Sequence, residues 1–246
     1  MRFFIFVLGL IIGSFLNVCI YRIPIDISII TPLSICKNCE TKLKPIDLFP
    51  VISWICLKRR CRYCGKSISI RYMMIELFTG ILFSILFHKI GFDLVLIPYF
   101  ILLSILIVIS FIDLDYYIIP NKVILFALII FMVLNVFLKY IEWKDAFLGA
   151  FIGGAFLLFI AVVTGGMGMG DVKLMTVIGL YLGWKNIIIS LFLSFIIGGV
   201  FGTGLLIFKV KGRKDAIPFG PWIALATYIT MVTGSGIMTW YIGLFF

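Results

Sequence analysis

Two aspartates stand out because each lies at the end of a long apolar run, where a charged side chain is costly unless it has a function. Asp113 closes the run 94–111, and Asp171 ends the motif Gly168-Met169-Gly170-Asp171 after the run 146–163. When two carboxylates lie close together, one holds its proton much more tightly than the other. The ionised member can take a proton from water while the protonated member polarises a carbonyl group. The pair therefore predicts an aspartyl active site.

The residues around Asp171 fit this interpretation but leave an alternative open. Gly168 and Gly170 permit backbone conformations that other residues avoid, and they let a substrate strand pass close to the main chain. An aspartate at the start of a helix can instead simply cap it and interact with its positive end. Lys173 either stabilises a charged pair of aspartates or extends toward the lipid headgroups.

Asp115 is the alternative partner for Asp171. Two residues along a helix subtend about 200°, so Asp113 and Asp115 point to nearly opposite sides and only one of them can face Asp171. Asp113 lies deeper in the apolar run, whereas Asp115 is followed by two tyrosines near the headgroups. We therefore expect Asp113 to be the partner.

Four cysteines form a second group with a chemical role. Cys36 and Cys39 make one CxxC pair, and Cys61 and Cys64 make another after 21 intervening residues. This spacing is close to that of sites in which four thiolates bind zinc tetrahedrally. Such a zinc ion has no open position for water, so it would be structural and would help to fold a small domain with little core. Disulfides or free thiols are the alternative, and disulfides require an oxidising compartment.

Composition shows which elements must position these residues. The chain has 246 residues, of which 63% are hydrophobic and 13% charged, far from the values of soluble globular proteins. Its apolar runs are near the roughly 20 residues that a helix needs to cross a bilayer. They do not alternate in the way that strands of a membrane barrel do. The sequence therefore predicts an all-α polytopic membrane protein.

We expect about eight transmembrane helices. The sixth is short, with Gly179 and Gly183 inside it, and such segments are tolerated where the backbone lines a cavity. The predicted spans are 3–21, 73–87, 94–111, 123–138, 146–163, 172–182, 187–208 and 221 to about 243.

Charge distribution predicts the orientation. Only Arg2 precedes the first span, whereas residues 22–72 contain ten Lys and Arg. By the positive-inside rule the N-terminus lies outside and residues 22–72 are cytoplasmic. Threading the remaining spans places Asp113 and Asp171 on the cytoplasmic side too. The excess of 21 basic over 11 acidic residues then reports orientation and contact with anionic lipids rather than nucleic-acid binding.

Three regions follow. Residues 1–21 form the first transmembrane helix, residues 22–72 a small cytoplasmic four-cysteine zinc domain like a zinc ribbon, and residues 73–246 a transmembrane aspartyl peptidase core.

The motifs together resemble those of the type IV prepilin peptidases, a family of bacterial membrane aspartyl enzymes, and the resemblance runs almost from end to end. The matching segments are Gly13-Ser14-Phe15-Leu16-Asn17-Val18, Arg22-Ile23-Pro24, the two CxxC pairs enclosing Asp47-Leu48 and Pro50-Val51-Ile52-Ser53-Trp54, Arg71-Tyr72 with Glu76, Asp113-Leu114, Ile119-Pro120-Asn121 and Gly168-x-Gly170-Asp171-Val172-Lys173-Leu174. Two departures are Lys58-Arg59-Arg60, where many members have a glycine, and Met73, where a proline is usual.

The resemblance implies an activity at the cytoplasmic face of the bacterial inner membrane. Members cleave a basic leader after a glycine in prepilins, or in the pseudopilins of type II secretion and competence. Those with the cysteine domain commonly also methylate the new N-terminus with S-adenosylmethionine. The catalytic pair of the family maps onto Asp113 and Asp171. Glu76, Asp47 and Arg71 are candidates for binding substrate or the methyl donor, although Glu76 is alternatively an interfacial residue near Arg71.

Three other functions fit parts of the pattern. A presenilin-like protease would use the same Gly-x-Gly-Asp motif but does not account for the cysteine domain. A proton-coupled transporter would place its acids near the middle of the bilayer and often shows repeated halves, which we do not find. A zinc-dependent membrane scaffold leaves the aspartates without a role.

Overall fold

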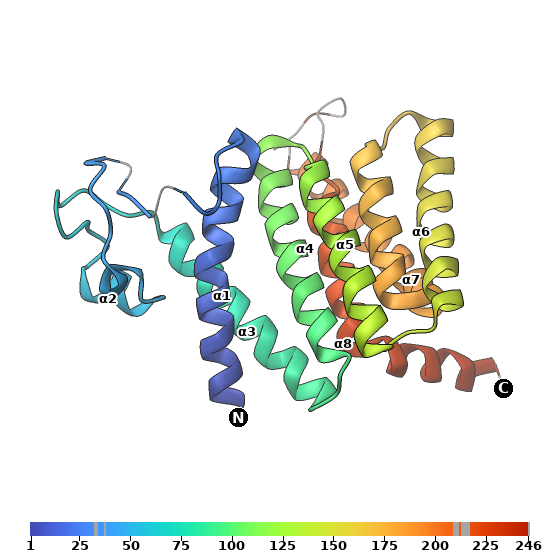
Figure 1. Ribbon diagram of the computed structural model, residues 1–246. Coiled ribbons are helices and arrows are strands. Elements are labelled where there is room, and N and C mark those ends of the chain that lie inside the picture. The colour runs from blue at the N-terminus through green and yellow to red at the C-terminus, as the bar shows by residue number, and fades with distance from the viewer. Residues whose placement is uncertain (32–33, 37, 209–211, 213–216, 246) are drawn as a thin grey trace. The chain divides into compact units, whose positions relative to one another are not determined.

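The computed structural model describes residues 1–31, 34–36, 38–208, 212 and 217–245, and the side chains up to residue 234 and at residue 236 within those ranges. Its regular structure there consists of helices and two isolated β-bridges, so the predicted all-α class is confirmed. The chain divides into two compact units, Met1–Gly91 and Phe92–Phe246 (Figure 1). The predicted boundaries after residues 21 and 72 do not coincide with this division, and the three predicted regions stay a prediction.

Helices α1 (Arg2–Arg22) and α3 (Ile70–Ile90) form the body of the first unit. They pack closely where Gly9 of α1 meets the backbone of Gly80, because a Cβ atom on Gly9 would lie 2.7 Å from the Gly80 Cα. The Asn17 side chain adds a polar link, since its Nδ2 donates to the Tyr72 carbonyl at 3.1 Å. The segment between α1 and α3 carries the cysteines and three short helices, η1 (Ile23–Ile25), η2 (Pro45–Leu48) and α2 (Ile52–Cys56).

The α3 helix is three residues longer at each end than the predicted span 73–87. At its start, the Ser69 Oγ accepts from the Arg71 N–H at 3.3 Å and caps the helix. At its end, Gly91 adopts a positive φ of 76° and stops it. Capping groups, and not the limits of the apolar run, therefore set the ends of this helix.

The second unit contains α4 (Leu96–Tyr116), α5 (Asn121–Leu138), α6 (Trp143–Thr164), α7 (Met169–Ile207) and α8 (Gly220–Phe245). Its first four helices alternate in direction, so the end of α4, the start of α5, the end of α6 and the start of α7 meet at one end of the unit (Figure 1). Inside, the Tyr181 hydroxyl of α7 donates to the Ala127 carbonyl of α5 at 2.9 Å. Between α7 and α8, the Ser190 and Thr227 hydroxyls lie 3.0 Å apart.

The predicted sixth and seventh spans are the two halves of α7. The backbone leaves helical geometry at Gly183, where φ is 75° and ψ is 174°. Residues 169–182, at about 1.5 Å each, extend only about 21 Å, less than the thickness of a hydrocarbon core of about 30 Å. The count of eight spans therefore stays a prediction.

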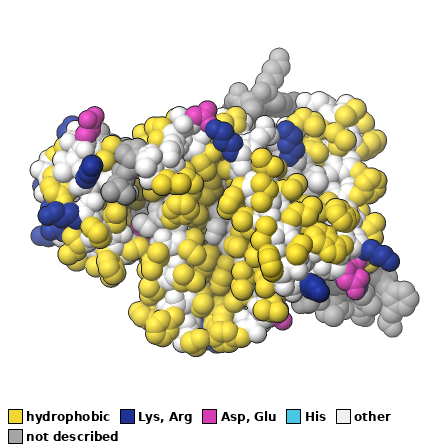
Figure 2. Space-filling view, viewed as in Figure 1, with side chains coloured by type: hydrophobic (Ala, Val, Ile, Leu, Met, Phe, Trp, Pro, Cys, Tyr) yellow, Lys and Arg dark blue, Asp and Glu magenta, His cyan; other side chains and the backbone are white. Residues whose placement is uncertain are grey.

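The long helices have the surface of a membrane protein. Within the described residues, six helices are long and apolar enough to cross a bilayer. On the face drawn in Figure 2, hydrophobic side chains cover these helices, while Lys and Arg gather over the cysteine region and near helix ends. The protein is therefore a multi-pass membrane protein.

The contact between α6 and α7 yields a testable prediction. Gly149 and Gly179 face each other so closely that a Cβ atom on either one would overlap the backbone of the other. Gly179→Ala should therefore force the helices apart and destabilise the fold by about 1–3 kcal/mol. Thermal unfolding of the protein in detergent measures the effect.

Gly199→Ala is the matched control, because a Cβ atom there meets nothing within 4 Å. A Gly179→Ala protein as stable as the Gly199→Ala protein would contradict the close packing of α6 on α7.

Candidate active site and metal centre

Asp113 lies in the last turn of α4 and is only 5% exposed. Its Oδ2 accepts a hydrogen bond of 2.9 Å from the backbone N–H of Gly220, the first residue of α8. A Cβ atom on Gly220 would lie 2.8 Å from the same oxygen, so only glycine allows this approach. The start of α8 is thus a part of the site that the sequence analysis missed. In the sequence, the start of this helix is indicated by the Gly220-Pro221 pair directly before the last apolar run.

Asp171 lies in the first turn of α7 and is 8% exposed. The two glycines of its motif make room for neighbours. A Cβ atom on Gly168 would lie 3.3 Å from the Asp171 Oδ2, and one on Gly170 would lie 3.0 Å from the Ile119 Cβ. Gly168 has φ −73° and ψ 142°, an extended conformation open to any residue, and Gly170 is helical. The expectation that these glycines adopt conformations barred to other residues is therefore wrong.

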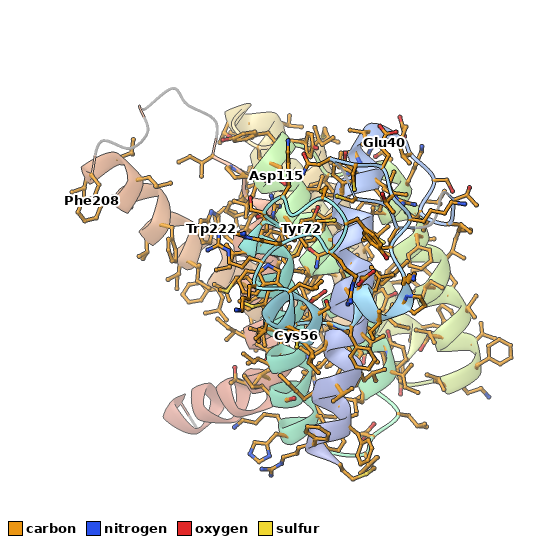
Figure 3. The ribbon with its side chains drawn as sticks, turned by 90° about the vertical axis from the view of Figure 1, so that its left-hand side faces the viewer. Glu40, Cys56, Tyr72, Asp115, Phe208 and Trp222 are labelled. Carbon is orange, nitrogen blue, oxygen red and sulfur yellow. The ribbon has the colours of Figure 1, made fainter. Side chains whose placement is uncertain are left out.

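The fold brings the two aspartates together. Helix α4 packs against α7, and the Asp113 carboxylate is near enough to Asp171 for their charges to interact. Asp115, two residues further along α4, is exposed instead, and Figure 3 shows it at the upper end of that helix. The angular separation of about 200° expected from helix geometry thus places one acid inside the unit and the other outside.

Lys173 connects the start of α7 to the start of α5. Its Nζ donates to the Asn121 Oδ1 at 2.9 Å, and the Lys173 side chain is exposed. Together with the contact between Gly170 and Ile119, this bond holds the α4–α5 connection against the Gly-x-Gly-Asp motif. The role of Lys173 in this structure is to join two helix starts.

The two CxxC pairs of the first unit sit in two similar hairpins. An antiparallel bridge between Ile35 and Lys42 encloses the first pair, and one between Arg60 and Ser67 encloses the second. In both hairpins the N–H of the first cysteine donates to the carbonyl of the residue five positions later. The N–H of the residue after the second cysteine donates to the carbonyl of the first cysteine. That residue, Glu40 or Gly65, has a positive φ in each. We call these hairpins the first and second knuckles.

The four thiols lie close enough together to bind one metal ion. The Sγ atoms of Cys36, Cys39, Cys61 and Cys64 all lie within 4.8 Å of one another. The Cys36 and Cys64 sulfurs are 3.9 Å apart, whereas a disulfide joins sulfurs at about 2.05 Å. Tetrahedral zinc with bonds of about 2.3 Å sets neighbouring sulfurs about 3.8 Å apart. The donor set and its spacing fit a structural metal ion.

Asp47 supports the second knuckle. Its side chain, only 3% exposed, accepts hydrogen bonds from the Arg62 Nε at 2.6 Å and the Tyr63 hydroxyl at 2.9 Å. A third bond of 3.2 Å comes from the Lys44 N–H. Burial favours the neutral carboxyl, but these bonds outweigh it and hold the pKa of Asp47 below its usual range. Because Arg62 and Tyr63 are the inner residues of the second CxxC, Asp47 fixes η2 to the four-cysteine cluster.

Glu76 makes the corresponding link to α3. It is buried in the second turn of α3, and its Oε2 accepts from the Val51 N–H at 2.7 Å. Arg71 is half-buried in the first turn of the same helix. Binding of substrate or methyl donor by Glu76, Asp47 and Arg71 remains a hypothesis. In this structure Glu76 and Asp47 both hold the cysteine region in place.

These features define the class of the protein as a multi-pass membrane protein with a pair of buried carboxylates and a four-cysteine domain. Two family models match the chain. Residues 7–90 match the bacterial peptidase A24 N-terminal domain, and residues 100–203 match the type IV leader peptidase family.

Relatives extend the similarity over nearly the whole chain. A prepilin leader peptidase/N-methyltransferase from Bacillus subtilis is 35% identical over 239 residues, which cover 97% of this chain and 96% of the relative. A protein with the same name from Aeromonas salmonicida is 33% identical, covering 97% of this chain and 92% of the relative. No solved structure matches. The chain belongs to the type IV leader peptidase family.

The metal centre yields a prediction about metal content. We expect one zinc ion per chain when the protein is purified without chelators, as measured by elemental analysis. Asp47→Ala should weaken zinc retention about tenfold or more, because it removes the acceptor that orients Arg62 and Tyr63. The measurement is the rate of zinc transfer to a chromogenic chelator.

Glu40→Gln is the control, since Glu40 is an exposed acid of the first knuckle. Protein without metal, or an Asp47→Ala variant that retains zinc as well as Glu40→Gln does, would refute the assignment.

Proposed function

We propose that this protein is a membrane aspartyl endopeptidase that cleaves the basic leader of prepilins or pseudopilins after a glycine and methylates the new N-terminus. The observation that carries this proposal is the meeting of two buried aspartates, Asp113 of α4 and Asp171 of α7, at one end of the second unit. Family membership and the names of the relatives support the substrate and the second activity.

Proton sharing between the aspartates supplies the hydrolytic chemistry. The ionised carboxylate takes a proton from the attacking water, and the protonated one donates a hydrogen bond to the scissile carbonyl. The Gly220 N–H holds the Asp113 Oδ2, so the orientation of this carboxylate is fixed before substrate binds. Proton return to the leaving amine regenerates the pair. Gly168 and Gly170 keep side chains away from the start of α7, where we expect the substrate strand to pass.

Zinc and S-adenosylmethionine have separate roles in this proposal. Cys36, Cys39, Cys61 and Cys64 would hold a zinc ion that stabilises the cysteine domain and leaves no coordination site for catalysis. S-adenosylmethionine would supply the methyl group that the newly formed amine accepts. We retain Glu76, Asp47 and Arg71 as candidates near which substrate or methyl donor binds.

The location follows from the charge pattern. We place the protein in the bacterial inner membrane with its N-terminus outside and the cysteine domain and aspartates at the cytoplasmic face. The basic residues of that face would contact anionic lipids, and we assign no nucleic-acid partner.

Substitution of the aspartates tests the hydrolytic mechanism. Asp113→Asn and Asp171→Asn should each lower cleavage of a synthetic prepilin by about 10³-fold or more, because an amide can neither accept nor supply the required proton. Asp115→Asn, on the exposed side of α4, should keep a substantial fraction of activity. Mass spectrometry of the products reads both the cleavage site and methylation. An active Asp113→Asn enzyme beside an inactive Asp115→Asn enzyme would show that the pair is wrongly assigned.

Methyl transfer should be separable from cleavage. We expect Asp171→Asn to methylate a peptide that already begins at the residue after the cleaved glycine, because this step needs no hydrolytic pair. Incorporation of labelled methyl groups from S-adenosylmethionine measures it, with wild-type enzyme as the reference. If Asp171→Asn loses this activity while remaining folded, the two reactions share one centre.

A further inference from the structure

The cysteine region carries an unexpected apolar surface. Four large side chains of η2, α2 and the turn between them are between 56% and 63% exposed, and we call them the η2–α2 patch: Ile46, Phe49, Ile52 and Ile55. A polar domain in water would lose stability by exposing such a cluster, since each fully buried side chain of this size contributes about 1.5–3 kcal/mol. Large apolar side chains that are exposed within so short a segment favour an interaction surface.

The position of the patch relative to α3 indicates what covers it. The Val51 N–H, in the middle of the patch, bonds to Glu76. Glu76 is six residues from the first residue of α3, or about 9 Å along a helix that is just long enough to span a bilayer. Figure 1 shows α2 level with the upper half of α3. Figure 3 shows Cys56 at the end of α2 near mid-height of α1, whereas Glu40 of the first knuckle lies near the upper end of α1.

The backbone at this point is held in a strained turn. Val51 has φ 62° and ψ −51°, and the Ile52 N–H bonds to the Pro50 carbonyl. A β-branched residue is a rare outlier in such a γ-turn. The strain persists because Glu76 binds the Val51 N–H, and this bond ties the start of α2 to α3.

Basic residues follow the patch directly. Lys58, Arg59 and Arg60 are all exposed, and the Arg59 guanidinium lies 5.7 Å from the centre of the Trp54 ring of α2. An apolar face with basic residues and a tryptophan at its edge is the composition of elements that lie in the membrane interface. This charge is complementary to anionic headgroups.

We propose that the η2–α2 patch inserts into the boundary between headgroups and acyl chains of the leaflet at the start of α3, with Lys58, Arg59 and Arg60 on anionic headgroups. The occupant of the patch is thus the lipid bilayer itself. The cysteine domain then enters the membrane from one side only, and the bond between Glu76 and the Val51 N–H fixes its depth. This inference does not rest on the peptidase activity, since it needs only that α3 spans the membrane.

Photo-crosslinking of the full-length protein in vesicles tests the proposal. A benzophenone amino acid replaces Phe49 or Ile52, and the protein is reconstituted in vesicles of phosphatidylethanolamine and phosphatidylglycerol. After irradiation, the adducts are identified by mass spectrometry. We expect lipid adducts at both positions, at a yield comparable to that of the same probe at Phe151, an exposed residue of α6. The probe at Glu40, an exposed residue of the first knuckle, should give only background. Replacing phosphatidylglycerol by phosphatidylcholine should lower the yield at Phe49 and Ile52 but not at Phe151.

A second variant separates lipid contact from misfolding. Ile55→Glu should reduce the lipid adduct formed by the probe at Ile52, while zinc content stays that of the unsubstituted protein. Background yield at Phe49 and Ile52 in zinc-loaded protein would overturn the proposal. So would adducts at these positions with a second copy of the chain, or with added prepilin, in place of lipid.

Discussion

The contact between the Asp113 carboxylate and the Gly220 N–H is the interaction on which the second unit depends. A carboxylate removed from water costs several kcal/mol unless hydrogen bonds or charges compensate it. Here the end of α4 and the start of α8 must meet within 2.9 Å, although 107 residues separate them. The start of α7 must then lie beside both, so that Asp171 joins the site. The arrangement of three helices thus follows from the burial of one acid.

The cysteine region solves a different problem, because it has little apolar core of its own. Among its described residues, polar links hold the region together in place of an apolar core. Asp47 bonds to both inner residues of the second CxxC, and Glu76 bonds to Val51. Together these links form a continuous path from the thiolates through η2 to a membrane helix. A metal ion held by the four cysteines would do more than close a hairpin, since it would also support the segment that α3 holds.

The sequence predicts those features that depend on local patterns. Apolar runs located the helices, Gly183 separates the two halves of α7 between the predicted spans, and a rotation of about 100° per residue distinguishes Asp113 from Asp115. The remaining features depend on contacts between distant segments. The Gly220-Pro221 pair indicates where a helix starts, but no local pattern shows that the Gly220 N–H reaches Asp113 or that Asp47 supports a knuckle. The sequence suggests unusual backbone conformations at Gly168 and Gly170. In the fold, these glycines instead leave space for the neighbouring Asp171 and Ile119 side chains.

The two knuckles share the same described backbone hydrogen bonds but should differ in stability. Gly65 adopts its φ of 69° without steric cost, whereas Glu40 occupies the equivalent position at φ 54°, a conformation that costs a residue with a Cβ about 1–2 kcal/mol. Asp47 also bonds to both inner residues of the second knuckle, and among the described residues it makes no such bond to the first CxxC. The site therefore has a strong and a weak half, which sets an order of disassembly. When zinc-loaded protein is treated with a chelator or an oxidant, Cys36 and Cys39 should dissociate and become alkylated first, while Cys61 and Cys64 should hold the ion longest.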